Sequence, residues 1–147
     1  MSIIYDVTDD SGVLYVVWDG PVTADDFLGY LRRLVADPGW PTRLRLQLDD
    51  ASTALPDRSI DRDVILAAVD ILAAHPDKLT GAKLAVVATE AFDPALDFVH
   101  IFLEHLPSSI ACHDVATACR WLGIDEAHAD GVLERLRAQA RGGAPAE

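Results

Sequence analysis

The stretch Lys83–Thr89, Lys-Leu-Ala-Val-Val-Ala-Thr, constrains the fold more than any other part of the chain. It is a short, nearly continuous apolar run, without the alternation of apolar and polar residues that a half-exposed strand shows. Its length and its β-branched residues favour a strand over a helix. We therefore expect a central parallel strand that is buried on both faces, with helical segments before and after it.

Two apolar stretches open the chain, residues 2–7 and 13–18, and turn residues that include Gly12 separate them. Glycine readily adopts the positive φ that tight turns require, so the two stretches should form an antiparallel hairpin. The first helix is expected to begin after Thr23. The Thr23 side chain would cap it, with Asp26 three residues later as a variant of the capping box.

Strands and helices then alternate along the chain. Apolar patterns and caps predict strands at 44–48, 83–89 and 109–113, and helices at 60–74, 94–106, 115–122 and 125–140. Asp114 would cap the helix 115–122, and Gly123 would end it. The predicted fold is α/β, an opening β-hairpin followed by βα units, with a five-stranded, mixed, mostly parallel sheet and packing helices.

The chain has 147 residues, half of them hydrophobic, which suits one domain with a core of its own. Residues 1–123 would form the α/β domain, residues 124–140 a C-terminal helical extension of the same domain, and residues 141–147 a frayed tail.

Acidic residues outnumber basic ones by 24 to 12, and the net charge is −12. A surface of this sign repels nucleic acid and anionic membranes, so neither is an expected partner. No apolar run approaches the roughly 20 residues that cross a bilayer, so we expect no stable membrane insertion. Met1–Thr8 lacks the features of a signal peptide, and two cysteines are few for a disulfide-dependent secreted domain. A cytoplasmic protein is the expectation.

Known catalytic motifs are missing from the sequence. It contains neither a glycine-rich nucleotide loop nor a Gly-x-Ser-x-Gly elbow, and it implies no cofactor. His100 and His105 are five residues apart, which is poor spacing for a shared metal ion. Cys112, His113 and Cys119 lack a CxxC unit and a fourth ligand. We therefore expect no metal site, and the cysteines should pack as small buried hydrophobes.

Three acidic residues, Asp49, Asp50 and Asp57, are predicted to crowd one polar loop after the third strand. In open α/β sheets, ligands bind at this carboxyl edge. Like charges held close together would raise one carboxyl pKa or hold a divalent cation. The alternative, which we favour, is a solvated loop whose side chains cap helices.

Several local features resemble small bacterial proteins of the STAS type. They are the opening strand Ser2–Tyr5, the segment Gly20–Thr23 before the first helix, Leu48-Asp49 at the end of the third strand, and Trp121–Gly123, which closes the fourth helix. These proteins are relatives of the anti-sigma-factor antagonists and are similar in fold to CRAL-TRIO lipid-binding domains. The resemblance covers roughly residues 2–123.

The resemblance implies a phosphoacceptor in the loop after the third strand, within an Asp-x-Ser-Gly-like pattern. The nearest match is Asp57-Arg58-Ser59-Ile60, which lacks the glycine and makes Ser59 the candidate phosphoacceptor. A phosphate there would suit a helix N-terminus but would also meet the charges of Asp57 and Asp61. Ser59 is adequately explained as the cap of the helix 60–74. The candidate partner-binding loop comprises Asp49, Asp50, Ser52, Thr53 and Asp57.

The favoured function is therefore a non-catalytic interaction or regulatory module that binds a partner protein or a second copy of itself. The alternative is a binder of a small apolar ligand or lipid in a cavity between the helices 60–74 and 94–106, which are unusually apolar. An enzyme that uses Asp49, Asp50 and Asp57 ranks last, because catalysis needs groups fixed around a concavity.

Overall fold

The computed structural model describes residues 2–6, 12–38, 46–75, 83–88 and 108–142. The described strands are β1 (Ile3–Asp6), β2 (Val13–Val22), β3 (Leu46–Pro56), β4 (Lys83–Val87) and β5 (Ser109–Cys112). The described helices are α1 (Ala24–Ala36), α2 (Arg62–Ala73), α5 (Val115–Leu122) and α6 (Glu126–Ala140). The helix predicted at 94–106 lies outside the described residues.

The five strands form one sheet in the order β1-β2-β3-β4-β5, which is also their order along the chain. β1 pairs antiparallel with β2, and every other pair is parallel. The predicted fold class, α/β with an opening hairpin and a mixed, mostly parallel sheet, is confirmed. The middle strand is β3, however, whereas β4 lies between β3 and β5. β4 is still an interior strand, and its residues Ala85, Val86 and Val87 are buried as the apolar run predicts.

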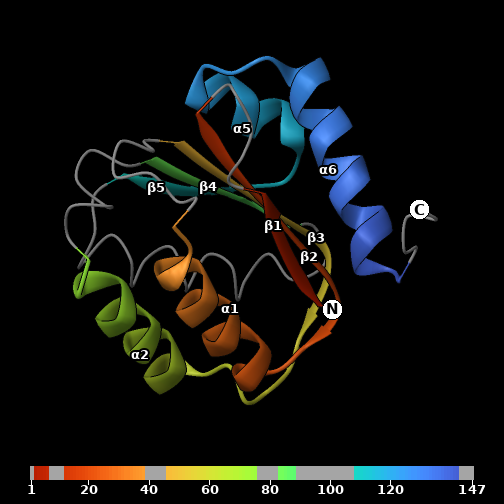
Figure 1. Cartoon of the computed structure of the whole chain (residues 1–147). Coiled ribbons are helices and arrows are strands. Elements are labelled where there is room, and N and C mark those ends of the chain that lie inside the picture. Colours follow the sequence, from red (N-terminus) through yellow and green to blue (C-terminus); the bar gives the residue numbers. More distant parts are fainter. Residues whose placement is uncertain (1, 7–11, 39–45, 76–82, 89–107, 143–147) are drawn as a thin grey trace.

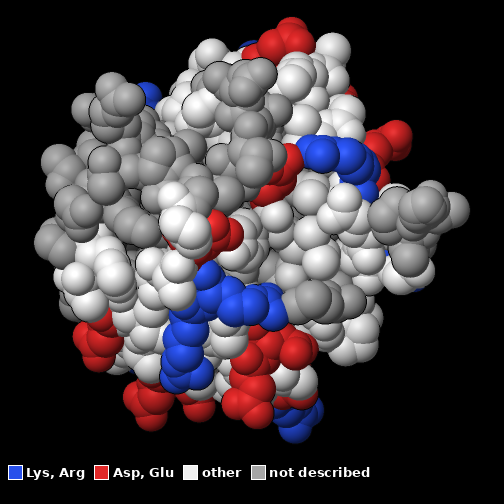
Figure 2. Space-filling model, in the orientation of Figure 1, with Lys and Arg blue, Asp and Glu red and all other residues white. Residues whose placement is uncertain are grey.

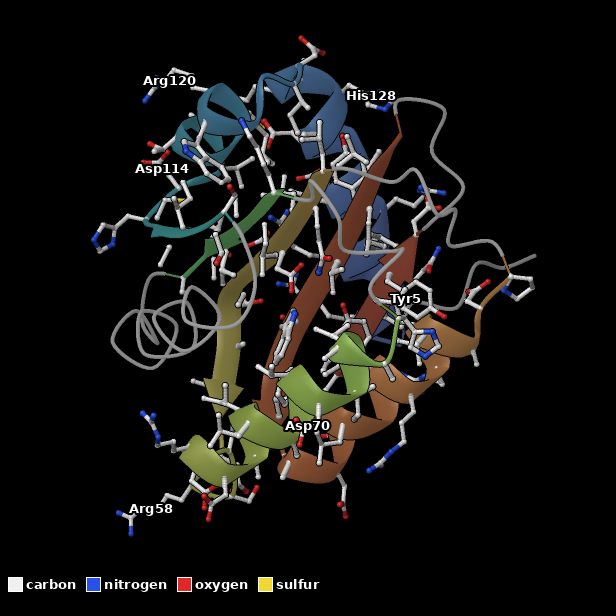
Figure 3. All side chains as sticks on the ribbon, turned by 90° about the vertical axis from the view of Figure 1, so that its left-hand side faces the viewer. Tyr5, Arg58, Asp70, Asp114, Arg120 and His128 are labelled. Atoms are coloured by element: carbon white, nitrogen blue, oxygen red, sulfur yellow. The ribbon has the colours of Figure 1, made fainter. Side chains whose placement is uncertain are left out.

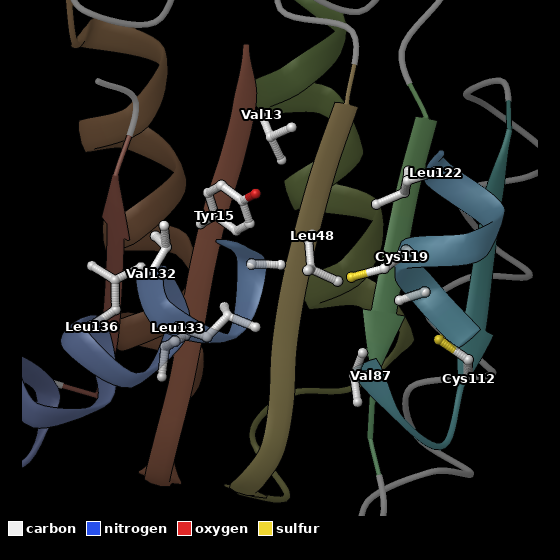
Figure 4. Packing of buried hydrophobic residues seen from close by; sticks show 14 residues of the cluster. Val13, Tyr15, Leu48, Val87, Cys112, Cys119, Leu122, Val132, Leu133 and Leu136 are labelled. Atoms are coloured by element: carbon white, nitrogen blue, oxygen red, sulfur yellow. The ribbon is translucent and has the colours of Figure 1, made fainter. Parts of the chain in front are cut away.

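Helices cover both faces of the sheet, with α1 and α2 on one side and α5 and α6 on the other (Figure 1). Alternate residues of β2 enter the two resulting cores, because successive side chains of a strand point to opposite faces. Leu14 and Val16 pack in the core beneath α1 and α2. Val13, Tyr15 and Val17 pack in the core beneath α5 and α6, part of which is shown in Figure 4.

Most of the predicted helix ends are confirmed in atomic detail. The Thr23 hydroxyl accepts a hydrogen bond from the Asp26 backbone amide at 3.1 Å, and the Asp26 carboxylate accepts one from the Thr23 amide at 3.0 Å. Asp114 caps α5, and Gly123 ends it with a φ of 75°. The cap predicted for the second helix is wrong. Asp61, not Ser59, accepts a hydrogen bond from the Val64 amide at 3.0 Å, and α2 begins at Arg62.

The polar loop predicted to follow the third strand at residue 48 is also wrong, because β3 continues as a strand to Pro56. The strand β2 likewise runs to Val22 rather than ending before Gly20. The two extensions pair with each other, and this long-range pairing outweighs the local turn propensity of the polar residues. One β2 residue, Trp18, stands opposite two β3 residues in this ladder, since Val17 pairs with Asp50 and Asp19 with Thr53.

The C-terminal helix α6 and Arg141, which follows it, are tied to the sheet by ion pairs with three strands. Its Arg135 pairs with Asp6 of β1, and its Arg137 pairs with Asp50 of β3. Just beyond the helix, Arg141 reaches Asp19 of β2 at 3.4 Å. No helix within the described ranges combines the length and the apolar character that spanning a bilayer requires.

Candidate functional site

The five residues predicted to share one partner-binding loop are separated by the structure. Asp49, Asp50, Ser52 and Thr53 lie within β3, and Asp57 follows it. Val16 pairs with Asp49 and Val17 pairs with Asp50, so the two carboxylates enter opposite cores. The acidic cluster expected at this edge of the sheet therefore does not form. Among the residues described, no group of three or more His, Cys, Asp or Glu side chains is placed to hold a metal ion.

Asp50 is buried on the side of α5 and α6, where its charge is compensated. Arg137 of α6 donates to one carboxylate oxygen. The other oxygen accepts from the Ser52 amide at 3.0 Å and from the Ser52 hydroxyl at 2.6 Å. A guanidinium and two further donors thus replace the water that the carboxylate loses on burial.

Asp49 is buried on the opposite side, and its hydrogen-bond donors are both neutral. The Trp18 indole nitrogen donates to Oδ2 at 3.1 Å, and the Gln47 amide nitrogen donates to Oδ1 at 2.8 Å. Burial raises the pKa of Asp49 to about 7, while these two hydrogen bonds lower it and the neighbouring charge of Asp50 raises it further. Asp49 therefore changes its protonation state near neutral pH.

Aromatic side chains of β2 and α1 lie beside Asp49. The Trp18 ring contacts the rings of Phe27 and Tyr30, with centroids 5.2 Å and 6.1 Å apart. The Tyr30 hydroxyl is buried, and within the described segments it makes no hydrogen bond of good geometry, although the Gln47 side chain lies close enough to lower its pKa. Burial, and then the charge of Asp49, raise the pKa of Tyr30 well above 10. No local pattern in the sequence indicates this arrangement, because Trp18 and Asp49 are 31 residues apart in the chain.

Ser59 lies in the exposed turn between β3 and α2. Its hydroxyl oxygen accepts a hydrogen bond from the backbone amide of Ala24, the first residue of α1, at 2.9 Å. Its own amide donates to the Asp57 carboxylate at 2.5 Å, and the hydrogen bonds from Ser59 lower the pKa of Asp57. The Asp57 amide in turn donates to the Val22 carbonyl at 2.9 Å. The turn therefore connects the end of β2 with the beginnings of α1 and α2.

Next to this turn, Leu55 is 53% exposed, and it is the only exposed large apolar side chain in the described part of the molecule. Ala54 points into the core beneath α1 and α2, so Leu55 points to the opposite face of the sheet. Its partner across the ladder is Pro21, which is exposed as well. We call Pro21, Leu55, Asp57, Arg58 and Ser59 the β3–α2 surface. Figure 3 shows Arg58 at this end of the molecule, directed away from the ribbon.

Both cysteines are packed, as predicted. Cys112 and Cys119 are buried and unpaired, and Figure 4 shows their side chains between the sheet and α5. The Cys112 thiol donates to the Val86 carbonyl at 3.6 Å. Burial raises the pKa of each thiol to about 11, so neither is a reactive thiolate at neutral pH.

Comparison of the chain with models of known protein families finds no match, and comparison with curated proteins finds none either.

Proposed function

We propose that this chain is a non-catalytic interaction module that binds a partner protein through the β3–α2 surface. The exposure of Leu55 carries this proposal. A large apolar side chain that is more than half exposed gains free energy when a partner covers it, by up to about 2 kcal/mol for a leucine. It is also rigidly placed, because it sits on a paired strand rather than on a loop.

Charge supports a protein as the partner. On the face shown in Figure 2, the basic side chains form short runs with acidic side chains directly beside them. Together with the net charge of −12, this pattern disfavours the phosphate backbone of a nucleic acid. The apolar side chain of Leu55 is followed in the chain by the exposed polar residues Asp57, Arg58 and Ser59, and such a mixture of apolar and polar groups suits a protein interface with an apolar core and a polar rim.

The position of Ser59 supports regulation of the same surface, as the STAS-like resemblance implies. Its hydroxyl is exposed and lies at the N-terminal amide of α1, where a phosphate would find a backbone donor and a favourable helix dipole. The nearby carboxylates of Asp57 and Asp61 would repel that phosphate. Phosphorylation would thus alter the charge of the surface within a few residues of Leu55.

A photo-crosslinking experiment tests the interaction. A photoreactive amino acid replaces Arg58 in one variant and Arg120, an exposed residue of α5, in a control variant. In cells that naturally make the protein, we expect a discrete crosslinked protein at position 58 and none at position 120. Adding Leu55→Asp should remove most of the product. A product at twice the mass of the chain would identify the partner as a second copy.

The proposal fails if positions 58 and 120 give the same products, or if Leu55→Asp leaves the yield at position 58 unchanged.

A further inference from the structure

Asp49 differs from its chain neighbour Asp50 in one physical respect. Both carboxylates are buried in β3, with 4% and 1% of their surfaces exposed. Asp50 has an arginine as its partner, whereas the partners of Asp49 in the described part of the chain are the neutral indole and amide groups of Trp18 and Gln47. A buried carboxylate without a counter-charge is costly, and the cost disappears when the group takes up a proton.

Among the residues that the structure describes, the groups that face Asp49 supply no compensating cation. α1 contributes Tyr30, and β1 contributes Tyr5, whose hydroxyl donates to Asp37 at 2.8 Å. Arg33 of α1 is exposed and acts on the two tyrosines. α2 contributes apolar side chains to this core, and Val86 of β4 stands opposite Asp49. Within the described segments, no Lys, Arg or His forms an ion pair with Asp49.

We infer that Asp49 is a proton-operated switch for the packing of α1 on the sheet. With a proton, the carboxyl group is neutral and the aromatic side chains of α1 and β2 pack over it. Without the proton, the buried charge favours any opening that admits water, and α1 carries two of the aromatic side chains, Phe27 and Tyr30, that pack around Trp18. Water admitted at this place would bond to the buried Tyr30 hydroxyl as well as to the carboxylate.

The inference is independent of the proposed interaction. It concerns the core beneath α1, and it would hold whether or not a partner binds at Leu55.

The Trp18 indole group provides a direct readout, because its N–H is bonded to the carboxylate itself. Histidines titrate in the same pH range, so a global signal would be ambiguous. In proton–nitrogen NMR spectra from about pH 5 to about pH 9, we expect the Trp18 indole resonance to follow one titration curve with its midpoint near neutrality. The Trp121 indole, on the opposite side of the sheet, serves as the internal reference.

Two variants assign the titration and connect it to α1. Asp49→Asn should abolish the Trp18 titration, whereas Asp70→Asn, at an exposed position of α2, should leave it unchanged. Free amides have their own pH dependence of hydrogen exchange, and the measured rates are corrected for it. Above the midpoint, the corrected exchange rates of the α1 amides in the natural sequence should still increase. In Asp49→Asn this increase should be absent.

An immobile Trp18 resonance, a titration that persists in Asp49→Asn, or α1 amides without this increase in corrected exchange rate would each overturn the inference. If Asp49→Asn does not fold, carbon NMR of the aspartate carboxyl groups in the natural sequence decides instead. An Asp49 carboxyl resonance that is constant over the same pH range would then refute the switch.

Discussion

At the scale of single residues, β3 shows that two adjacent side chains, which point to opposite faces of the sheet, can have very different environments. Asp49 and Asp50 have identical chemistry and adjacent positions, yet one faces Trp18 and the other faces Arg137. The ionised form of Asp50 is stabilised by its arginine. The ionised form of Asp49 is destabilised by burial, and its pKa rises to about 7.

Replacing Asp49 by asparagine should therefore stabilise the protein at high pH. The pKa of Asp49 is higher in the folded chain than in the unfolded one, so ionisation favours unfolding, and the penalty grows from about pH 4 to about pH 7. Each pKa unit of difference is worth about 1.4 kcal/mol. Asp49→Asn removes this penalty, and the Gln47 amide can turn to accept from the new amide group.

Urea unfolding at about pH 5 and about pH 8 checks this prediction. The free energy of unfolding of Asp49→Asn should exceed that of the natural sequence by on the order of a few kcal/mol at the higher pH, and by clearly less at the lower one. A difference that does not depend on pH would contradict it.

Removing the partner of Asp50 should have the opposite effect. Arg137→Met leaves a buried carboxylate uncompensated and should lower the free energy of unfolding by about 3–5 kcal/mol. The matched control is Arg135→Met on the same helix, where the arginine side chain is 54% exposed and the expected loss is about 1 kcal/mol or less. Urea unfolding measures both variants. Equal losses of unfolding free energy would show that the buried Arg137–Asp50 pair stabilises the fold no more than the exposed Arg135–Asp6 pair.

At the scale of elements, the turn between β3 and α2 assigns different roles to two residues. Asp61 caps α2 by accepting from the Val64 amide. Ser59 accepts from the Ala24 amide and so fastens the turn to α1. The sequence suggested Ser59 as the cap because serine is a preferred cap residue near the start of the apolar pattern. Asp61 is preferred equally, and only the structure distinguishes the two.

Amide hydrogen exchange distinguishes Asp61, the cap of α2, from Ser59, which bonds to the first amide of α1. Asp61→Ala should expose the Val64 amide and cost about 1 kcal/mol of stability. Ser59→Ala should expose the Ala24 amide, leave Val64 protected, and cost less than about 1 kcal/mol because water can replace the lost bond. Faster exchange of Val64 in Ser59→Ala would mean that Ser59 caps α2 after all.

The extension of β3 beyond residue 48 has no signature in the local sequence. Asp49–Pro56 is rich in polar and turn-forming residues and lacks a strand pattern of its own. One extra β3 residue stands opposite Trp18, and it shifts the alternation of side chains between the two faces of the sheet by one residue. Ala54 rather than Leu55 therefore enters the core beneath α1 and α2. No local signal marks this insertion, because it exists only in relation to β2. The exposure of Leu55 follows from it.

At the scale of the whole molecule, α6 completes the second core. Val132, Leu133 and Leu136 pack in the same cluster as Val13 and Tyr15 of β2. Removing residues 124–147 would expose that face of the sheet to water, which costs about 25 cal/mol for each Å² of apolar surface.

We therefore expect the chain truncated after Gly123 to aggregate, or to lose its cooperative thermal unfolding. The matched control ends at Gly142 and should keep the unfolding temperature of the full chain, because the sequence predicts a frayed tail there. Circular dichroism with heating checks both. Cooperative unfolding of the shorter chain at the same temperature would show that α6 is dispensable.

The sequence alone determined the fold class and most element positions of this protein. Apolar runs and helical periodicity indicate which segments are buried in the core. Helix caps, such as Thr23 with Asp26, depend on residues within four positions of each other. These are local effects, so a single sequence contains them.

Only the tertiary structure decided that β3 is the middle strand, that Asp49 and Asp50 enter different cores, and that Leu55 is left exposed. Each of these depends on contacts between segments far apart in the chain, such as Trp18 with Asp49 and Arg137 with Asp50. The free energy of such contacts comes from burial and pairing that do not exist until the sheet has formed.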